Sequence, residues 1–312
     1  MDDFDDLLER ATRALGGLEV KQAFVAVRAI IGPERFPEGE DVAQQGMDAL
    51  RVGKVPSPAQ RIALETVIKS LRPSILSAKA VLGKLPAYHA YADKVFPQWG
   101  AFGKAISPYL YSVGRIDKVD GEKTNPLATG FVVAPGIVVT NTHVLDAISA
   151  NTRRLQKGQA VIQFGQEYGV VPDIDPVAIT GVVAVHEELD MSLLSIEDKS
   201  RPPWQIDSNP IAKARAVAAV GYPQDDPRSP VFREIFQNTF GVKRAAPGEV
   251  RGTSCNAVYH DCSTLGGNSG SPLVDMDSTK VVGIHRDGPL FLFRNEAVDG
   301  AALAKFVGHQ IN

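Results

Sequence analysis

Residues 266–273 read Gly-Gly-Asn-Ser-Gly-Ser-Pro-Leu, and the interpretation of the whole chain starts from this stretch. It places Ser269 among small residues, in a loop whose backbone can bend sharply. A serine hydroxyl is a poor nucleophile unless a base takes its proton and hydrogen-bond donors stabilise the resulting oxyanion. Gly267 has no Cβ, so its amide can lie close to a substrate carbonyl, beside the amide of Ser269. The stretch therefore indicates a nucleophile loop in which Gly267 and Ser269 form an oxyanion hole.

A candidate base lies upstream of this loop. Two runs rich in β-branched residues, 131–133 and 137–140, flank an Ala-Pro-Gly sequence. This pattern predicts a hairpin whose second strand ends just before His143. Val144 and Leu145 follow and can anchor the chain while the imidazole faces a cleft. His143 is therefore the predicted general base.

A third motif supplies a carboxylate. Asp190 lies at the start of an apolar run that extends to Ile196, so we expect it at the beginning of a strand. A carboxylate in that position can hold an imidazole in the correct tautomer and stabilise it once it is protonated. Glu187 and Glu188 precede the strand and are expected to face solvent. We therefore predict a triad of His143, Asp190 and Ser269.

The three motifs resemble, in residue type and order, those of the trypsin-like (chymotrypsin-fold) serine peptidases. The order His, Asp, Ser differs from that of subtilisins and α/β-hydrolases. The resemblance covers residues 105–312. It implies an all-β, two-barrel domain with a C-terminal helix, which cleaves peptide bonds of protein or peptide substrates through an acyl-enzyme. A catalytically idle peptidase fold that serves as a binding module is the alternative.

A closer similarity is to the bacterial glutamyl endopeptidases, through residues 263–272 and the strand sequence 281–285. In those enzymes the matching threonine and histidine line the S1 pocket and bind an acidic P1 side chain. The resemblance thus implies that Thr264 and His285 form S1 and that glutamate is preferred at P1. A hydroxyl and an imidazole are suitable donors for a carboxylate. A small or apolar P1, with His285 in a structural role, remains open.

Two departures from these families concern control of the enzyme. Digestive trypsin-like enzymes have an aspartate before the nucleophile that pairs with a new N-terminus, whereas this chain has Asn268. Activation of that kind is therefore not expected. Glutamyl endopeptidases use a processed N-terminal amine near the pocket, but here about a hundred residues precede the peptidase region.

The N-terminal region has a helical pattern. Apolar residues recur at helical spacing, which predicts an α-helical bundle over residues 1–95, followed by the peptidase domain over 96–312. The expected helices cover about 4–15, 20–31, 41–51 and 58–71, with a fifth over 75–82. The architecture resembles bacterial conflict-system effectors, so the bundle is expected to be an adaptor or regulatory domain that binds a protein partner. A pro-segment or an intramolecular inhibitor is the alternative.

Composition narrows the remaining possibilities. The formal net charge of −3 gives no electrostatic case for nucleic acid or a membrane surface, and the apolar runs are too short to span a bilayer. The acidic start at residues 1–6 is unlike a secretory signal, so a cytoplasmic protein is expected. Cys255 and Cys262 are then expected to be free thiols. Since His260 is the only imidazole near them, neither a metal site nor a cofactor is expected.

Overall fold

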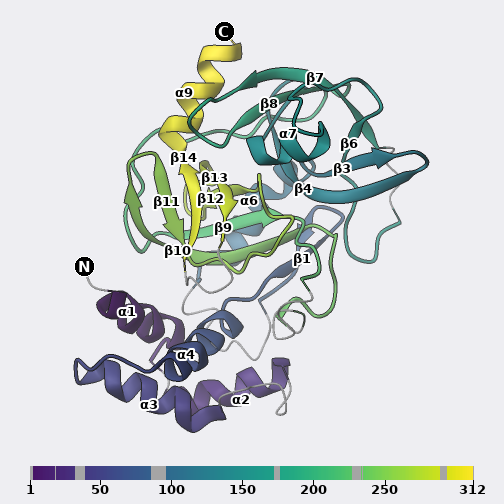
Figure 1. The fold of residues 1–312 in the computed structure, drawn as a ribbon. Coiled ribbons are helices and arrows are strands. Elements are labelled where there is room, and N and C mark those ends of the chain that lie inside the picture. Colours follow the sequence, from purple (N-terminus) through teal and green to yellow (C-terminus); the bar gives the residue numbers. More distant parts are fainter. Residues whose placement is uncertain are drawn as a thin grey trace. The chain divides into compact units, whose positions relative to one another are not determined.

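The computed structural model consists of two compact units, each considered by itself (Figure 1). The helical unit comprises residues 1–74, 84–99 and 226–239, and the barrel unit comprises residues 75–83, 100–225 and 240–312. The structure describes residues 3–17, 19–31, 39–85, 96–171, 176–226, 233, 235–288 and 294–311.

The helical unit contains α1 (Asp3–Leu15), α2 (Val20–Ile31), α3 (Gly39–Arg51) and α4 (Pro58–Ser70). Capping is visible at α4, where the Ser57 hydroxyl accepts the Gln60 N–H at 3.3 Å and the Gln60 side chain accepts the Ser57 N–H at 2.8 Å. This reciprocal pair is a capping box, and proline suits the position that follows the cap. The helices predicted at these four places are confirmed.

The interior of the helical unit is apolar with one charged pair. Buried apolar side chains come from all four helices and include Leu7, Phe24, Met47 and Leu64. Two parallel hydrogen bonds of 2.6 Å join the Arg10 guanidinium on α1 to the carboxylate of Glu65 on α4. Their side chains are only 4% and 3% exposed, so each charge depends on the other for compensation. This pair fixes the register of α1 against α4.

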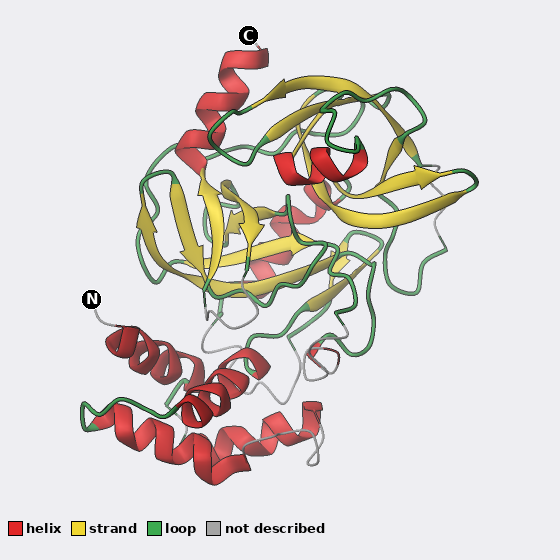
Figure 2. Cartoon of the chain, in the orientation of Figure 1, coloured by secondary structure: helices red, strands yellow, loops and turns green. Residues whose placement is uncertain are grey.

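The first part of the barrel unit is a closed barrel with the strand order β3-β4-β5-β8-β7-β6 (Figure 2). The predicted hairpin is confirmed, with Gly136 in the left-handed region between its strands (φ 76°). The barrel encloses an apolar core that includes Val132, Val138 and Leu194. A short helix, α7 (Thr142–Ile148), follows β5. The strands are β3 (Val113–Asp120), β4 (Lys123–Ala134), β5 (Ile137–Thr140), β6 (Ala160–Gln163), β7 (Val177–Val185) and β8 (Ser192–Ile196).

The second barrel closes through β9-β10-β11-β14-β13-β12, because β12 pairs again with β9. Its core includes Val217, Val250 and Leu273. The chain then forms α9 (Gly300–Ile311), which confirms the predicted C-terminal helix. The strands are β9 (Ala216–Gly221), β10 (Arg244–Ser254), β11 (Ala257–His260), β12 (Pro272–Asp275), β13 (Val281–Asp287) and β14 (Asn295–Asp299). Helix α6 (Trp99–Leu110) precedes β3 in sequence.

The fifth helix predicted over residues 75–82 is wrong. This segment is a hairpin of β1 (Ile75–Ala78) and β2 (Val81–Leu82), and β1 pairs with β10 of the second barrel. Lys79 and Ala80 both have positive φ (52° and 55°), which is the geometry of a tight two-residue hairpin turn. The apolar run suits a helix equally well, but pairing with β10 gives its backbone groups partners that a helix prediction cannot anticipate.

A buried charged network holds this hairpin in the barrel unit. The Glu167 carboxylate accepts hydrogen bonds from the Ser77 hydroxyl at 2.9 Å and the Ala80 N–H at 2.8 Å. Lys243, which is fully buried, donates to Glu167 at 3.3 Å and to the Leu110 carbonyl at 2.6 Å. Burial lowers the pKa of Lys243 to about 8, so it is mostly charged at neutral pH and compensates Glu167.

Both cysteines are free thiols, as predicted, with Cys255 exposed and Cys262 buried. None of the described helices is both long and apolar enough to cross a membrane. Within the described ranges, no group of three or more His, Cys, Asp or Glu side chains could hold a metal ion.

Candidate active site

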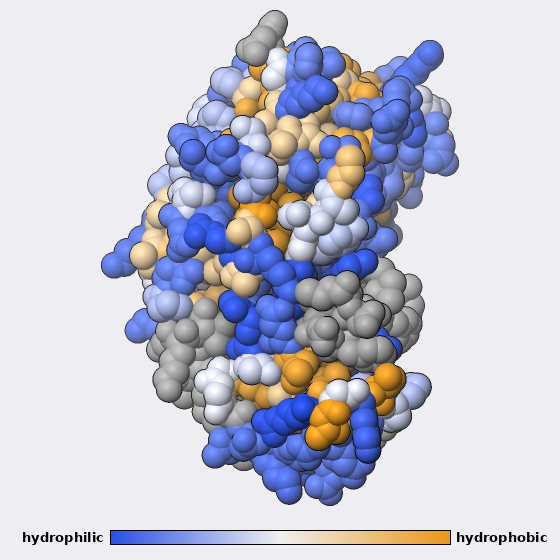
Figure 3. All heavy atoms as spheres, turned by 90° about the vertical axis from the view of Figure 1, so that its left-hand side faces the viewer, coloured by the Kyte–Doolittle hydropathy of each residue, from blue (hydrophilic) through white to orange (hydrophobic). Residues whose placement is uncertain are grey.

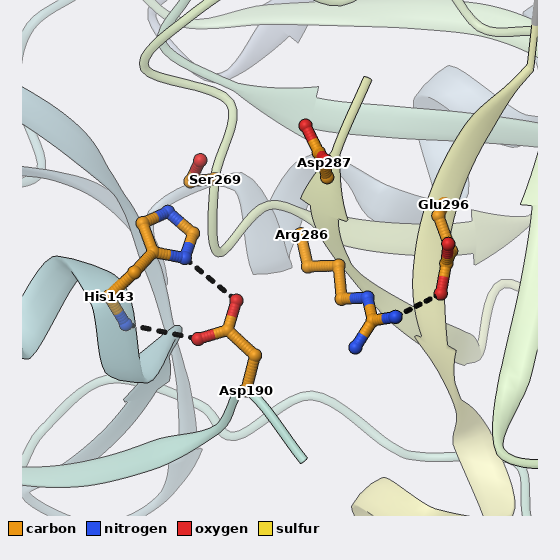
Figure 4. A pocket seen from close by; sticks show the side chains of 6 residues that line it. All are labelled: His143, Asp190, Ser269, Arg286, Asp287 and Glu296. Atoms are coloured by element: carbon orange, nitrogen blue, oxygen red, sulfur yellow. Dashed lines mark hydrogen bonds and ion pairs between the residues drawn. The ribbon is translucent and has the colours of Figure 1, made fainter. Parts of the chain in front are cut away.

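The structure brings the three residues of the predicted triad to one cleft of about 450 Å³ (Figure 4). His143, Asp190 and Ser269 line it together with Arg286, Asp287 and Glu296. In Figure 4 the imidazole of His143 lies between the side chains of Ser269 and Asp190. The first barrel supplies His143 and Asp190, whereas Ser269 comes from the loop between β11 and β12 of the second.

Asp190 is held from several directions. Its carboxylate accepts the His143 Nδ1–H at 2.7 Å and the His143 backbone N–H at 3.0 Å. Because an ionised carboxylate only accepts, this contact places the imidazole proton on Nδ1 and leaves Nε2 free to accept. Asn141 donates to the Asp190 carbonyl at 2.8 Å, and the Thr142 hydroxyl donates to the Met191 carbonyl at 3.0 Å. The junction of β5 and α7 thus fixes the carboxylate relative to the imidazole.

The charge state of Asp190 follows from these contacts. Burial acts to raise the pKa of its carboxyl, but the hydrogen bonds and charge of His143 and the Thr142 N–H outweigh burial. The pKa of Asp190 therefore lies below its usual value, and the carboxylate is ionised at neutral pH.

The nucleophile loop has a backbone that only glycine allows at two positions. Gly267 and Gly270 have φ of 89° and 84°. A Cβ at position 267 would lie 2.3 Å from the Tyr222 carbonyl oxygen, and one at position 270 would lie 2.1 Å from that of Thr129. In the described chain, the amides of Gly267 and Ser269 donate to no protein acceptor. Both amides are thus available to an oxyanion.

Thr129 on β4 connects this loop to the first barrel. Its N–H donates to the Ser269 carbonyl at 2.9 Å, and its hydroxyl donates to the Gly267 carbonyl at 2.7 Å. The same hydroxyl accepts the Tyr222 N–H at 3.1 Å. The Thr129 carbonyl in turn accepts the hydroxyl of Thr140, which is at the end of β5, close to His143 in sequence. The two barrels therefore meet at one buried threonine.

The predicted S1 residues are Thr264, in the same β11–β12 loop as Ser269, and His285 on β13, and neither is among the described residues that line the cleft. The His285 backbone exchanges hydrogen bonds with the loop, accepting from Gly270 at 2.8 Å and donating to Ser271 at 2.9 Å. Thr264 is partly buried, and its hydroxyl lies 3.5 Å from where a Cβ on Gly288 would be, just beyond β13. The structure thus places both residues around the loop, without a hydrogen bond between their side chains in the described chain.

A second histidine contacts His285. Nε2 of His260 on β11 lies 3.2 Å from Nδ1 of His285, and both side chains are buried. Burial lowers the pKa of His260 to about 4. Burial, and then the nearby imidazoles of His260 and His143, hold the pKa of His285 well below its ordinary value. Both imidazoles are therefore neutral at neutral pH.

Sequence reasoning missed several residues of the site. Thr129, Asn141 and His260 act through contacts with distant segments, and no local pattern marks them. Arg286 and Glu296 form an ion pair on neighbouring strands β13 and β14, at the edge of the cleft. Glu187 and Glu188 are exposed, as expected, and it is Asp190 that accepts the hydrogen bonds of the His143 ring and N–H.

Comparison with known proteins gives one family and one fold. The family model of the trypsin-like peptidase domain matches residues 128–284. A probable serine protease of Lysobacter enzymogenes is 28% identical, over 79% of this chain and 75% of its own. The serine endoprotease from Yersinia pestis has a similar structure, with a TM-score of 0.50, 17% identity, and coverage of 67% of this chain and 66% of its own. The active form of a protease from M. tuberculosis gives a TM-score of 0.46 at 19% identity, covering 66% of this chain and 83% of its own.

The link through Thr129 can be tested by replacing it with valine, which has nearly the same shape but no hydroxyl. Thr129→Val leaves the Gly267 carbonyl and the Tyr222 N–H buried without that partner, at a cost of about 1–3 kcal/mol for each group. We expect a lower free energy of unfolding in urea and a lower kcat/KM on a peptide. Thr129→Ser keeps the hydroxyl and should lose only about 1 kcal/mol for the methyl group. Equal behaviour of the two variants would contradict the proposed link.

Proposed function

Because the chain belongs to the trypsin-like peptidase family, we propose that Ser269 is its nucleophile, His143 its general base and Asp190 the residue that orients His143. The protein is a serine endopeptidase that acts on protein or peptide substrates. One observation carries the assignment of roles: two hydrogen bonds join His143 to Asp190 in a cleft that also contains Ser269.

The proposed reaction follows from this geometry. Ser269 Oγ attacks the scissile carbonyl while His143 Nε2 accepts its proton, and Asp190 stabilises the imidazolium. The amides of Gly267 and Ser269 donate to the oxyanion of the tetrahedral intermediate. His143 then gives its proton to the leaving amine, which produces the acyl-enzyme. Water, deprotonated by His143, attacks this ester, and the resulting intermediate collapses to free Ser269.

The alternative of an idle binding module receives little support. Such folds arise where triad residues are lost, whereas all three are present here and line one cleft. Asn268 also has partners within its own loop, donating to the Leu265 carbonyl and accepting from the Ser271 hydroxyl, both at 3.3 Å. The loop is thus ordered without an ion pair from a new N-terminus.

The triad assignment predicts a specific pattern of activity. Ser269→Ala should abolish turnover, and Asp190→Asn should lower kcat by about 10⁴-fold, because an amide at that position favours the wrong imidazole tautomer. Glu188→Gln is the matched control and should retain wild-type turnover. Steady-state kinetics on a peptide pool checks this. Turnover by Asp190→Asn together with its loss in Glu188→Gln would reverse the assignment.

We further propose that S1 accepts glutamate, through Thr264 and His285. In this arrangement His260 donates its Nε2 proton to Nδ1 of His285, so that His285 presents Nε2–H to the P1 carboxylate. Neither Thr264 nor His285 could pair with a basic P1 side chain. The main rival is a small or apolar P1, which a hydroxyl and a neutral imidazole also tolerate.

The acidic pocket predicts a pH dependence of selectivity between P1-Glu and P1-Gln peptides. A bound carboxylate favours the charged imidazole and raises the pKa of His285 from its depressed value in the free enzyme, so binding takes up a proton. In the charged form His285 Nδ1–H donates to Nε2 of His260, whose own ring proton then lies on Nδ1. The ratio of kcat/KM values, Glu over Gln, should therefore fall as the pH rises from about 5.5 to about 8, a range in which the glutamate stays ionised.

The matching variant is His285→Ala. It should lower kcat/KM for a P1-Glu peptide about tenfold or more relative to a P1-Ala peptide, as expected for a lost hydrogen bond to a charged group. Equal losses on both peptides, or a Glu-to-Gln ratio that does not vary with pH, would exclude the acidic pocket. The assignment of the triad would be unaffected.

We also propose that the helical unit is an adaptor that binds a protein partner. Its helices bury a core of their own, yet three large apolar side chains stay exposed: Val52 (68%) and Val55 (65%) between α3 and α4, and Ile62 (45%) on α4. In Figure 3 apolar side chains, coloured orange, gather in places at the surface between hydrophilic ones. An adaptor of this kind recruits substrates without taking part in the chemistry.

This role predicts that a shortened protein starting at Ile75 cleaves a short peptide as fast as the full chain. Ile75 is the appropriate start because the β1–β2 hairpin belongs to the barrel unit. The measurement is kcat/KM for both proteins on the same peptide, with urea unfolding to check that the shortened protein is folded. A marked rise in kcat/KM would identify the helices as an inhibitor instead.

A further inference from the structure

The turn that leads into Asp190 is built around one imidazole. It connects β7, which ends at Val185, to β8, which begins at Ser192. Nδ1 of His186 accepts the N–H of Glu188 at 3.2 Å and the N–H of Leu189 at 3.1 Å. The base of the turn is closed by the His186 N–H, which donates to the Met191 carbonyl at 2.9 Å.

These contacts determine the tautomer of the His186 imidazole. A backbone N–H can only donate, so Nδ1 must present its lone pair and the ring proton must lie on Nε2. The ring is located independently by α9, because it contacts the Phe306 ring edge-on, with centroids 5.3 Å apart. The contact with Phe306 of α9 thus positions the imidazole, and the backbone of the turn hydrogen-bonds to its Nδ1.

Side-chain packing gives the turn little other support. A cavity of about 540 Å³ is lined by Glu187, Glu188 and Leu189 on one side and by Lys305, Phe306 and His309 of α9 on the other. The space between turn and helix is therefore not filled by side chains. Hydrogen bonds to His186, together with one from the Met191 N–H to the Leu189 carbonyl at 2.7 Å, hold the backbone around Asp190, rather than a packed core.

The position of Asp190 depends on two segments, the β5–α7 junction and the turn held by His186. Asn141 and His143 hold its carbonyl and carboxylate from the β5–α7 junction. The His186 turn determines how the chain reaches those contacts. A displacement of about 1 Å in a catalytic constellation can cost about 10²-fold in rate.

We propose that His186 is a positioning residue of the peptidase, which holds the turn 187–189 and thereby the carboxylate of Asp190. The proposal rests on the proposed role of Asp190 as the residue that orients His143. His186 acts through Asp190 and touches neither substrate nor reacting atoms.

Two variants separate the hydrogen bonds of His186 from its ring contact. In His186→Asn, Oδ1 can accept the same two N–H groups, as asparagine commonly does at the start of a turn. His186→Phe keeps a ring against Phe306 but has no acceptor. We expect His186→Phe to lower kcat about 10- to 100-fold with KM unchanged, and His186→Asn to restore most of the loss.

A readout independent of turnover follows the His143–Asp190 hydrogen bond itself. The Nδ1 proton of His143 in this short hydrogen bond should give a far-downfield ¹H NMR resonance in the wild-type protein. The resonance should persist in His186→Asn and be shifted or broadened in His186→Phe. Urea unfolding of both variants, compared with Phe306→Leu, separates this effect from a general loss of stability.

The outcomes distinguish this proposal from the proposed function. Loss of activity in His186→Asn with wild-type kcat in His186→Phe would mean that only the ring contact matters, and would overturn the proposal. Wild-type kcat and an unchanged resonance in both variants would overturn it as well. By contrast, full activity of Asp190→Asn would overturn the role of Asp190, whatever the His186 variants show.

Discussion

The hydroxyl of Thr129 joins the two halves of the active site. The hydroxyl donates to the Gly267 carbonyl and accepts the Tyr222 N–H. The backbone of Thr129 donates its N–H to the Ser269 carbonyl and accepts the Thr140 hydroxyl at its own carbonyl. The base and the orienting carboxylate come from one barrel and the nucleophile from the other, so the reaction requires a fixed relation between the two barrels. The buried Thr129 hydroxyl keeps the two barrels in this position, because separating it from either hydrogen-bond partner would leave a buried polar group unpaired and cost free energy. The glycines of the loop then allow the close approach that these bonds need.

The ionisable groups around the nucleophile are of two kinds, an ionised carboxylate and two neutral imidazoles. Beside the nucleophile, Asp190 is kept ionised by hydrogen bonds from His143 that outweigh the effect of burial. Behind the nucleophile loop, burial keeps His260 and His285 neutral. A neutral imidazole can donate to a substrate and take up a proton when an anion binds, whereas a permanently charged one would carry a desolvation cost in the empty pocket. The proposed preference for glutamate relies on this difference.

The triad could be predicted from the sequence because each member lies in a short motif of its own. The β4–β5 hairpin before His143 and the glycine-rich loop around Ser269 are local patterns with a clear physical meaning. Thr129 could not be assigned, since its role depends on a carbonyl 138 positions away. For the same reason the helix predicted over residues 75–82 is wrong, because the pairing of β1 with β10 is a long-range contact. In the sequence His260 is only the single imidazole near the two cysteines, and its contact with His285 emerges from the fold.

Labelling with a fluorophosphonate is the decisive test of whether Ser269 is the nucleophile and His143 activates it. The full-length protein is treated with the probe, digested, and mapped by mass spectrometry. We expect one adduct, on the peptide containing Ser269, which forms far more slowly in His143→Ala because the base is missing. An adduct on another residue, or labelling of Ser269→Ala at the wild-type rate, would contradict it.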